Sequence, residues 1–171
     1  MKKSLFILVV LSLMASTTAQ DSKQHQVIKQ LEQLHAFIEH SPVAQLETEY
    51  LKTMQATGLP ASKLNLPDGT YHGETPADDF GYRHVIRFEV KNGKLGQLDY
   101  DEIHADGHAK EADEQYGEKM STSGTTPAIA YPIYENALME QQNLQELDAV
   151  SGASYSLYRF KLAVAYAIAT H

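Results

Sequence analysis

The sequence predicts an α+β protein in which an antiparallel sheet, built on a glycine-turn hairpin with flanking helices, follows an N-terminal helical hairpin. Three observations predict this fold class. Apolar residues recur at helical spacing in the first third of the chain, two alternating runs meet at Asn92-Gly93, and the last segment is apolar and rich in alanine. A length of 171 residues suits one ordinary domain with a small addition.

The first 19 residues have the layout of a secretory signal peptide. Two lysines precede an apolar run from Leu5 to Met14, and small residues lead to Ala19. Cleavage after Ala19 would leave Gln20 as the first residue. The run is shorter than the roughly 20 apolar residues of a membrane span, and the chain has no cysteine to carry a lipid. We therefore expect a periplasmic or secreted protein with no transmembrane span after signal removal.

Residues 20–60 form the predicted N-terminal helical segment. Apolar positions with helical spacing continue on both sides of Ser41-Pro42, where serine suits an N-cap and proline suits the first helical position. The second helix should end near Gly58. This helical hairpin either packs on the domain or, as the alternative, forms a dimerising coil, although its heptads are few.

Strands are predicted after a linker that is rich in turn-forming residues. The stretch "GTYHGE" is followed by two runs that alternate between apolar and polar residues. The runs meet at Asn92-Gly93, a strong short-range signal for a hairpin that spans Val85 to Ile103. Phe88 and Leu95 should therefore lie in paired antiparallel strands, and one face of the sheet should be covered.

The C-terminal half is predicted to be mainly helical. A loop at residues 121–127 precedes a helical segment over 128–142, and the last helix runs from about Tyr155 to Thr170. Because this helix is apolar, we expect it to be buried, which holds its start in a fixed place. The stretch "DAVSGASYS" at this start contains three serines and a glycine, more polar residues than one helix cap needs.

Charge and motif spacing argue against several classes of function. Removing the leader deletes two lysines and no acid, so the formal net charge falls from −8 to −10, which disfavours a nucleic-acid partner. His104 and His108 have the spacing of helical metal ligands, but Asp106-Gly107 between them is typical of a turn, so we expect no metal site. A serine hydrolase is disfavoured because Ser154 has no G-x-S-x-G elbow.

Four stretches, taken in order, resemble the FMN-binding domain family of exported covalent flavoproteins. They are "DGTYHGE", "VIRFEVKNGKL", "DYDEIHADGHAKEADEQYGEKM" and "DAVSGASYS" before the apolar helix. That family includes flavinylated subunits of the sodium-pumping quinone reductase and of a related electron-transport complex, and small exported carriers. The resemblance spans Asp68 to about Ile168 and implies that residues 61–171 are an FMN-binding domain.

The resemblance also implies an attachment site. In the family, the pattern Asp-x-x-Ser/Thr-Gly-Ala-Thr/Ser marks the place where a flavin transferase joins FMN, through its phosphate, to the last hydroxyl. The pattern matches Asp148, Ser151, Gly152, Ala153 and Ser154. Ser154 would therefore carry FMN in a phosphoester bond, with serine in place of the threonine that is the commonest acceptor in the larger subunits.

The chemistry of these residues suits a phosphate. Backbone amides and the helix dipole at a helix start favour an anion, and Gly152 and Ala153 let a cofactor approach the main chain closely. Asp148 would orient the hydroxyl or bind a metal during the transfer. The alternative is a simple N-cap, in which Ser151 or Ser154 bonds the free amides and contributes about 1 kcal/mol.

The flavin ring needs an apolar slot with a few polar groups. Lys110, Asp113, Tyr116 and Met120 would fall along one helical stripe that contributes to this slot. Alternatively, Tyr116 and Met120 belong to the core and Lys110 is a solvated charge. The polar edge of the ring would be lined by two loop hydroxyls, Thr125 and Thr126.

Two functions of different classes remain open. In the first, an exported electron carrier accepts electrons through its flavin from a membrane or soluble donor and passes them to an acceptor, as a redox carrier more than a substrate-converting enzyme. In the second, the same fold carries no flavin and is a non-redox binding or interaction module that recognises a partner through its N-terminal helices. The colour of native material separates the two.

Overall fold

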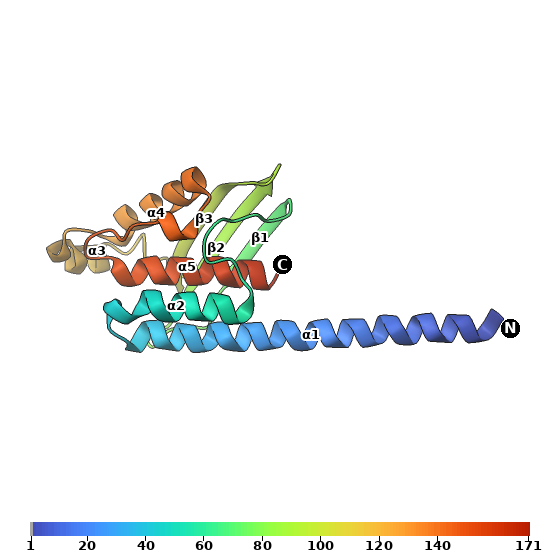
Figure 1. Cartoon of the computed structure of the whole chain (residues 1–171). Helices are drawn as coiled ribbons and strands as arrows, with labels where there is room; N and C mark the ends of the chain where they lie inside the picture. The colour runs from blue at the N-terminus through green and yellow to red at the C-terminus, as the bar shows by residue number, and fades with distance from the viewer. Residues whose placement is uncertain (1) are drawn as a thin grey trace.

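A three-stranded antiparallel sheet of order β1-β2-β3 is the framework of the computed structural model, which describes residues 2–171 and the side chains of all residues from Gln20 on except Ser123. Helices lie around the sheet and an N-terminal helical pair precedes it, so the predicted α+β class is confirmed (Figure 1). The elements are α1 (Lys2–His40), α2 (Val43–Thr57), β1 (Gly69–Glu74), β2 (Tyr82–Lys91), β3 (Lys94–His104), α3 (Glu114–Met120), η1 (Ser121–Ser123), α4 (Pro127–Gln141), η2 (Leu144–Glu146) and α5 (Ser154–Ala169).

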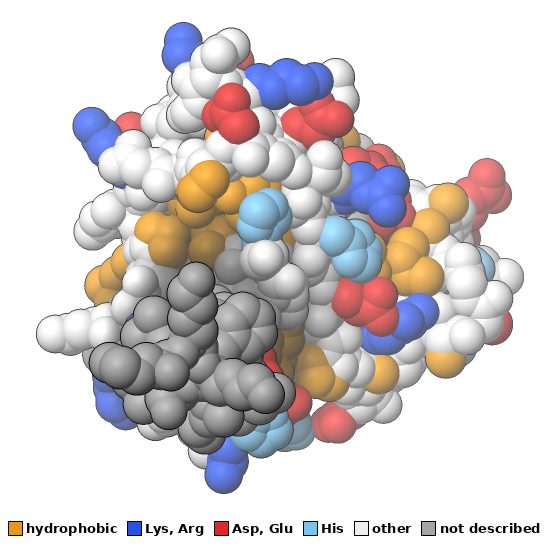
Figure 2. Space-filling model, turned by 90° about the vertical axis from the view of Figure 1, so that its right-hand side faces the viewer, with side chains coloured by type: hydrophobic (Ala, Val, Ile, Leu, Met, Phe, Trp, Pro, Cys, Tyr) orange, Lys and Arg blue, Asp and Glu red, His pale blue; other side chains and the backbone are white. Residues whose placement is uncertain are grey.

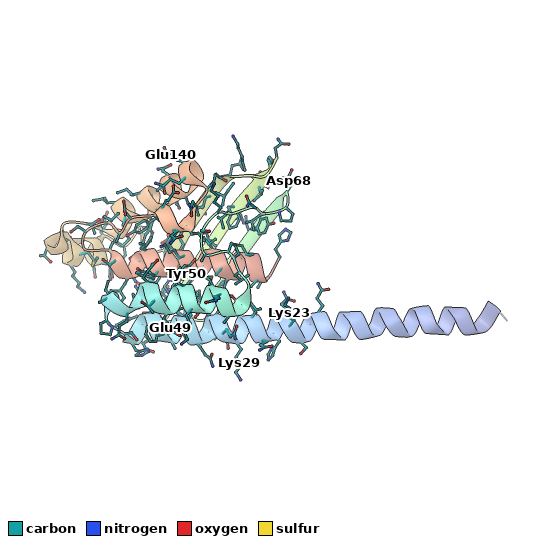
Figure 3. The ribbon with its side chains drawn as sticks, viewed as in Figure 1. Lys23, Lys29, Glu49, Tyr50, Asp68 and Glu140 are labelled. Atoms are coloured by element: carbon teal, nitrogen blue, oxygen red, sulfur yellow. The ribbon has the colours of Figure 1, made fainter. Side chains whose placement is uncertain are left out.

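The hairpin of β2 and β3 forms as predicted, with Phe88 and Leu95 in its two paired strands. Both turn residues have positive φ, 53° at Asn92 and 69° at Gly93, as a type I′ turn requires. The Asp68 carboxylate, labelled in Figure 3, accepts hydrogen bonds from both turn amides at 2.9 and 3.0 Å. These two bonds lower the pKa of Asp68 and join the turn to the start of β1.

Helix α5 lies between the sheet and the α1/α2 pair and is buried along most of its length (Figure 1). One hydrophobic core joins α5 to the sheet and α4, and a second joins it to α1 and α2. Tyr50 of α2 belongs to the second core and is 1% exposed (Figure 3). Strand β1 approaches α5 so closely that a Cβ at Gly73 would lie 2.5 Å from the Ala163 carbonyl oxygen and the Ala167 nitrogen. The second half of α5 is therefore packed directly against β1.

The N-terminal helical hairpin packs on the domain, and its apolar positions such as Leu31, Leu34 and Leu46 are buried against α5. Helix α2 ends at Gly58, whose φ is 74°. The predicted cap was wrong: Pro42 is the N-cap and makes no side-chain bond. With a ψ of 141°, Pro42 is too extended to be the first helical residue.

The N-terminal part of α1 extends beyond the rest of the molecule (Figure 1). It contains the predicted leader, whose side chains lie outside the described residues. A search of the described residues finds no helix with the length and apolarity that crossing a membrane requires. Figure 2 shows basic and acidic side chains interspersed on the face turned toward the viewer.

Candidate functional site

The loop before α5 is a tight turn that ends at the first helical residue, Ser154. The Ala153 amide donates a 2.9 Å hydrogen bond to the Val150 carbonyl, and Gly152 between them has a φ of 82°. A turn with positive φ at its third residue suits glycine. Ser151 and Gly152 are exposed at the tip of this turn, Ala153 is buried, and Ser154 is partly exposed.

A buried tyrosine from α4 holds this turn in place. The Tyr134 hydroxyl donates to the Ala153 carbonyl at 2.9 Å and accepts from the Val150 amide at 3.2 Å. Tyr134 is only 1% exposed, and its ring lies 5.9 Å from that of Phe160. The backbone on both sides of Ser151-Gly152 is therefore fixed by the core.

The N-terminus of α5 has no side-chain cap. Ala153 is the N-cap residue, and no described side chain caps the helix. The alternative in which Ser151 or Ser154 caps the helix is therefore not what the structure has. The first amides of a helix have no partner within the helix. An anion placed beside Ser154 can therefore accept hydrogen bonds from them.

A cavity of about 490 Å³ opens near the strand ends and α3. It is lined by Phe80, Tyr82, His104, Asp106, His108, Lys110, Tyr116 and Arg159. Pockets for small ligands and cofactors span about 300–1,000 Å³ and combine aromatic walls with a few polar groups. The cavity fits this description, and two of its residues, Lys110 and Tyr116, were predicted from the sequence.

Lys110 is the central cation of the cavity, and it is buried, so the alternative of a solvated charge is wrong. Its ammonium group forms an ion pair with Glu102 and lies 4.4 Å from the ring centroid of Tyr82 and 4.8 Å from that of Tyr116. This arrangement places a positive charge between two aromatic faces, where cation–π attraction stabilises it.

The predicted helical stripe through Lys110 and Asp113 was also wrong. Asp113 is the N-cap of α3, and its carboxylate accepts a 2.9 Å hydrogen bond from the Tyr116 amide. Lys110 lies before the helix, where its amide bonds the Glu102 carbonyl at 2.9 Å. Pairing with β3 therefore places Lys110 against Tyr116, although the two do not share a helix.

Arg159 of α5 also lines the cavity and lies next to the buried Glu102. Its guanidinium binds both carboxylate oxygens of Glu39 and lies 3.7 Å from Glu102. Burial opposes the charge of Glu102, but the neighbouring His84, Arg159 and Lys110 side chains lower the pKa of its carboxyl to about 2. Glu102 is therefore ionised near neutral pH and fixes both cations.

No protein-family model matches the sequence. The chain is 31% identical over 99 residues to the 15 kDa lipoprotein of Treponema pallidum (strain Nichols), a match that covers 57% of this chain and 70% of the relative. The chain belongs to the family of this lipoprotein. A lipoprotein is an exported protein, so membership of this lipoprotein family supports the export that the leader predicts.

The crystal structure of the CPE2226 protein from Clostridium perfringens is similar to the structure of this chain. The two are 37% identical, with a TM-score of 0.56, and the match covers 60% of this chain and 87% of the other. The similarity supports the fold over more than half of the chain.

The predicted site residues fall into three groups, of which the first two are the predicted attachment turn and the cavity. The attachment turn contains Asp148, which is exposed, and the residues up to Ser154, whereas Lys110 and Tyr116 line the cavity. Ser154 does not line the cavity. On α5 it precedes Arg159 by about 7.5 Å of rise and points about 140° away around the axis.

The other predicted residues lie around α3 and the start of α4, toward the same end of the molecule as the start of α5 (Figure 1). Met120 is the partly exposed last residue of α3, and Thr125 is buried. Thr126 is the N-cap of α4, and its methyl group would lie 3.9 Å from a Cβ at Gly117. Neither threonine lines the cavity.

Sequence reasoning missed Phe80, Tyr82 and Arg159. An arginine inside a mainly apolar, alanine-rich helix was a readable signal for Arg159. Phe80 is 73% exposed at the cavity, and a loop aromatic gives no comparable signal. The histidines that the sequence singled out each pair with an aspartate, His104 with Asp106 at 3.0 Å and His108 with Asp113 at 3.2 Å.

Removing the Tyr134 hydroxyl should loosen the attachment turn. In Tyr134→Phe, the Val150 amide and the Ala153 carbonyl lose their shared partner, and we expect the free energy of unfolding to fall by about 1–3 kcal/mol in urea titrations. The matched control is Tyr155→Phe, whose more exposed hydroxyl donates a 3.0 Å bond to the Ser41 carbonyl. Equal losses in the two variants would contradict a special role for Tyr134.

Proposed function

We propose that this chain is an exported carrier protein to which FMN is joined through a phosphoester bond at Ser154. The observation that carries the proposal is a hydroxyl on the first residue of a buried helix whose N-terminus has no side-chain cap. The resemblance of Asp148–Ser154 to the attachment pattern of FMN-binding domains supports the same residue. As an exported protein, it would act in the periplasm or after secretion.

The residues of the turn fit a phosphate. Amides of the first turn of α5 are free to donate to phosphate oxygens, and the helix dipole favours the negative charge. Gly152 has no side chain to obstruct the approach of the phosphate. The buried Tyr134 fixes the backbone of the turn through its hydrogen bond to the Ala153 carbonyl. In the transfer, Ser154 Oγ gains the bond to phosphorus as a phosphoanhydride bond of a flavin dinucleotide breaks, releasing a nucleotide, and the hydroxyl proton goes to a base.

The cavity offers a place for the ring. Tyr82, Tyr116 and Phe80 provide aromatic surface, and Lys110 and Arg159 provide positive charge near the ring's polar edge. A phosphate at the tip of α5 leaves the flexible ribityl chain to cover the about 7.5 Å of helix rise between Ser154 and Arg159 and to pass about 140° around the helix. When bound, FMN would supply one- and two-electron redox chemistry.

The carrier would need an enzyme that attaches the flavin and redox partners that exchange electrons with it. A flavin transferase would make the bond, and a membrane or soluble donor and acceptor would exchange electrons with the bound flavin. The chain contains no cysteine, so a thiol-linked lipid like that of many lipoproteins has no acceptor in this sequence, and we propose a form without that lipid.

Co-expression of the full chain with a flavin transferase tests the function. We expect a yellow protein, a fluorescent band on a denaturing gel, an intact mass raised by one FMN less one water, and a flavin-bearing peptide within Leu147 to Arg159. Wild-type protein that stays colourless and unlabelled under these conditions would favour the non-redox binding module. A flavin on a different residue would reject Ser154.

A further inference from the structure

A second cluster of chemically reactive side chains lies outside the attachment turn, between α1 and β2. His35 and Glu39 are one helical turn apart on α1, and His84 faces them from β2. His35 Nε2 lies 4.0 Å and His84 Nε2 lies 3.9 Å from Glu39 Oε1. The three ligand atoms are all within 4.8 Å of one another.

Most nitrogens of this cluster are buried without a partner. His84 is fully buried and His35 is 5% exposed, and among the described residues neither His35 Nε2 nor either ring nitrogen of His84 has a hydrogen-bond partner. Buried polar atoms are nearly always satisfied, so such a group requires an explanation. The rings meet edge to face at 5.3 Å, but a weak N–H···π contact replaces only one hydrogen bond.

The surroundings are those of a metal ligand set. A histidine that binds a metal through one nitrogen usually directs the other at a carboxylate, and a ligating carboxylate is itself hydrogen-bonded. His84 Nδ1 faces Glu102 Oε1 at 3.9 Å, and that oxygen also has no hydrogen-bond partner in the described part of the chain. Arg159 binds both oxygens of Glu39 and so holds the carboxylate toward the histidines.

We propose that His35 Nε2, Glu39 Oε1 and His84 Nε2 bind one divalent transition metal ion of the Zn²⁺ class. Two imidazoles and a carboxylate match the preferences of these ions. Bond lengths of about 2.0–2.1 Å at tetrahedral angles separate ligand atoms by about 3.3–3.4 Å. The two separations from Glu39 Oε1, 3.9–4.0 Å, thus need to shrink by about 0.6 Å. The separation between the two histidine nitrogens, which lies within 4.8 Å, needs to shrink by at most about 1.4 Å, and side-chain rotations of both rings provide these changes.

The site has an access route and an open position. His35 and Glu39 line a groove of about 340 Å³ that also contains Asp78 and Asp79, so water can supply the fourth ligand. Asp78 Oδ2 is buried, has no hydrogen-bond partner among the residues whose side chains are described, and can accept a hydrogen bond from that water.

The local charge also favours a cation. The positive charges of Arg159 and Lys110 are opposed by three carboxylates, those of Glu39, Glu102 and Asp78, which leaves an excess of negative charge for the ion. The ion would join α1 to β2. It does not depend on flavin at Ser154.

Metal titration of the tag-free full chain tests the site. Protein made in a host without a flavin transferase is stripped with a chelator and titrated with Zn²⁺ by calorimetry. We expect one site per chain and a rise in Tm on saturation. His35→Gln and His84→Gln should each weaken this site by at least about 100-fold, since loss of an outer-shell partner alone weakens binding 10–100-fold.

His40→Gln is the matched control, because His40 lies on the exposed last turn of α1, outside the proposed ligand set, and pairs with Asp79 and the Ala36 carbonyl. It should keep the full affinity. The absence of a 1:1 site in folded wild-type protein would overturn the proposal, and so would retention of the site in both ligand variants or its loss in the control. If the ligand variants fail to fold, X-ray absorption of the Zn²⁺-loaded wild type decides: two imidazoles support the site, and fewer than two reject it.

Discussion

Ser154→Ala should abolish covalent FMN completely while leaving the fold nearly intact. The hydroxyl is the only group of the side chain that the phosphoester bond needs, and Ser154 does not cap α5. A partly exposed serine on a first helical turn can be replaced by alanine at little cost in stability. The measurements are in-gel flavin fluorescence after co-expression with a transferase and urea unfolding of the unmodified protein.

Three companion variants separate attachment from structure. Ser154→Thr keeps a hydroxyl and should keep the flavin. Ser151→Ala removes an exposed hydroxyl that makes no cap, so it should change the free energy of unfolding by less than about 0.5 kcal/mol and retain flavin. Asp148→Asn should lower the yield of attachment, because its carboxylate serves the transfer and not the finished protein. Flavin retained in Ser154→Ala would contradict the assignment outright.

The sheet and the helices around it could be predicted because their signals are local. Asn92-Gly93 has the backbone preference of a hairpin turn, and the alternating residues on either side, such as Phe88, have the period of a strand. Local signals are weaker at boundaries. Ser41-Pro42 indicated the break between α1 and α2 but not which residue is the cap, since Pro42 accommodates an extended ψ as readily as a helical one.

The cavity could be predicted only in part because long-range pairing builds it. Lys110 and Tyr116 were chosen for a helical spacing that they do not have, and they meet because the chain after β3 folds back beside Glu102. The proposed metal ligands could likewise be predicted from the sequence only in part. The His35–Glu39 spacing was readable on a helix, but only the sheet brings His84, far along the chain, beside them.

Replacing Lys110 should destabilise the protein more than any change at the attachment turn. In Lys110→Met, the apolar stem is kept and the charge is lost, so the fully buried Glu102 carboxylate loses its closest cation. Breaking a buried ion pair by removing one partner costs about 3–5 kcal/mol. We expect about 3 kcal/mol, the lower end of that range, because Arg159 still lies 3.7 Å from Glu102.

Urea unfolding of the metal-free, flavin-free chain measures this loss. Lys52→Met is the matched control, since Lys52 pairs with Glu49 on the exposed surface of α2 and such pairs contribute about 0–1 kcal/mol. The double variant Lys110→Met with Glu102→Gln should recover part of the loss, because no carboxylate is then left buried without its cation. If Lys110→Met is no more destabilised than Lys52→Met, Lys110 does not stabilise the Glu102 carboxylate, and Arg159 is the cation that does.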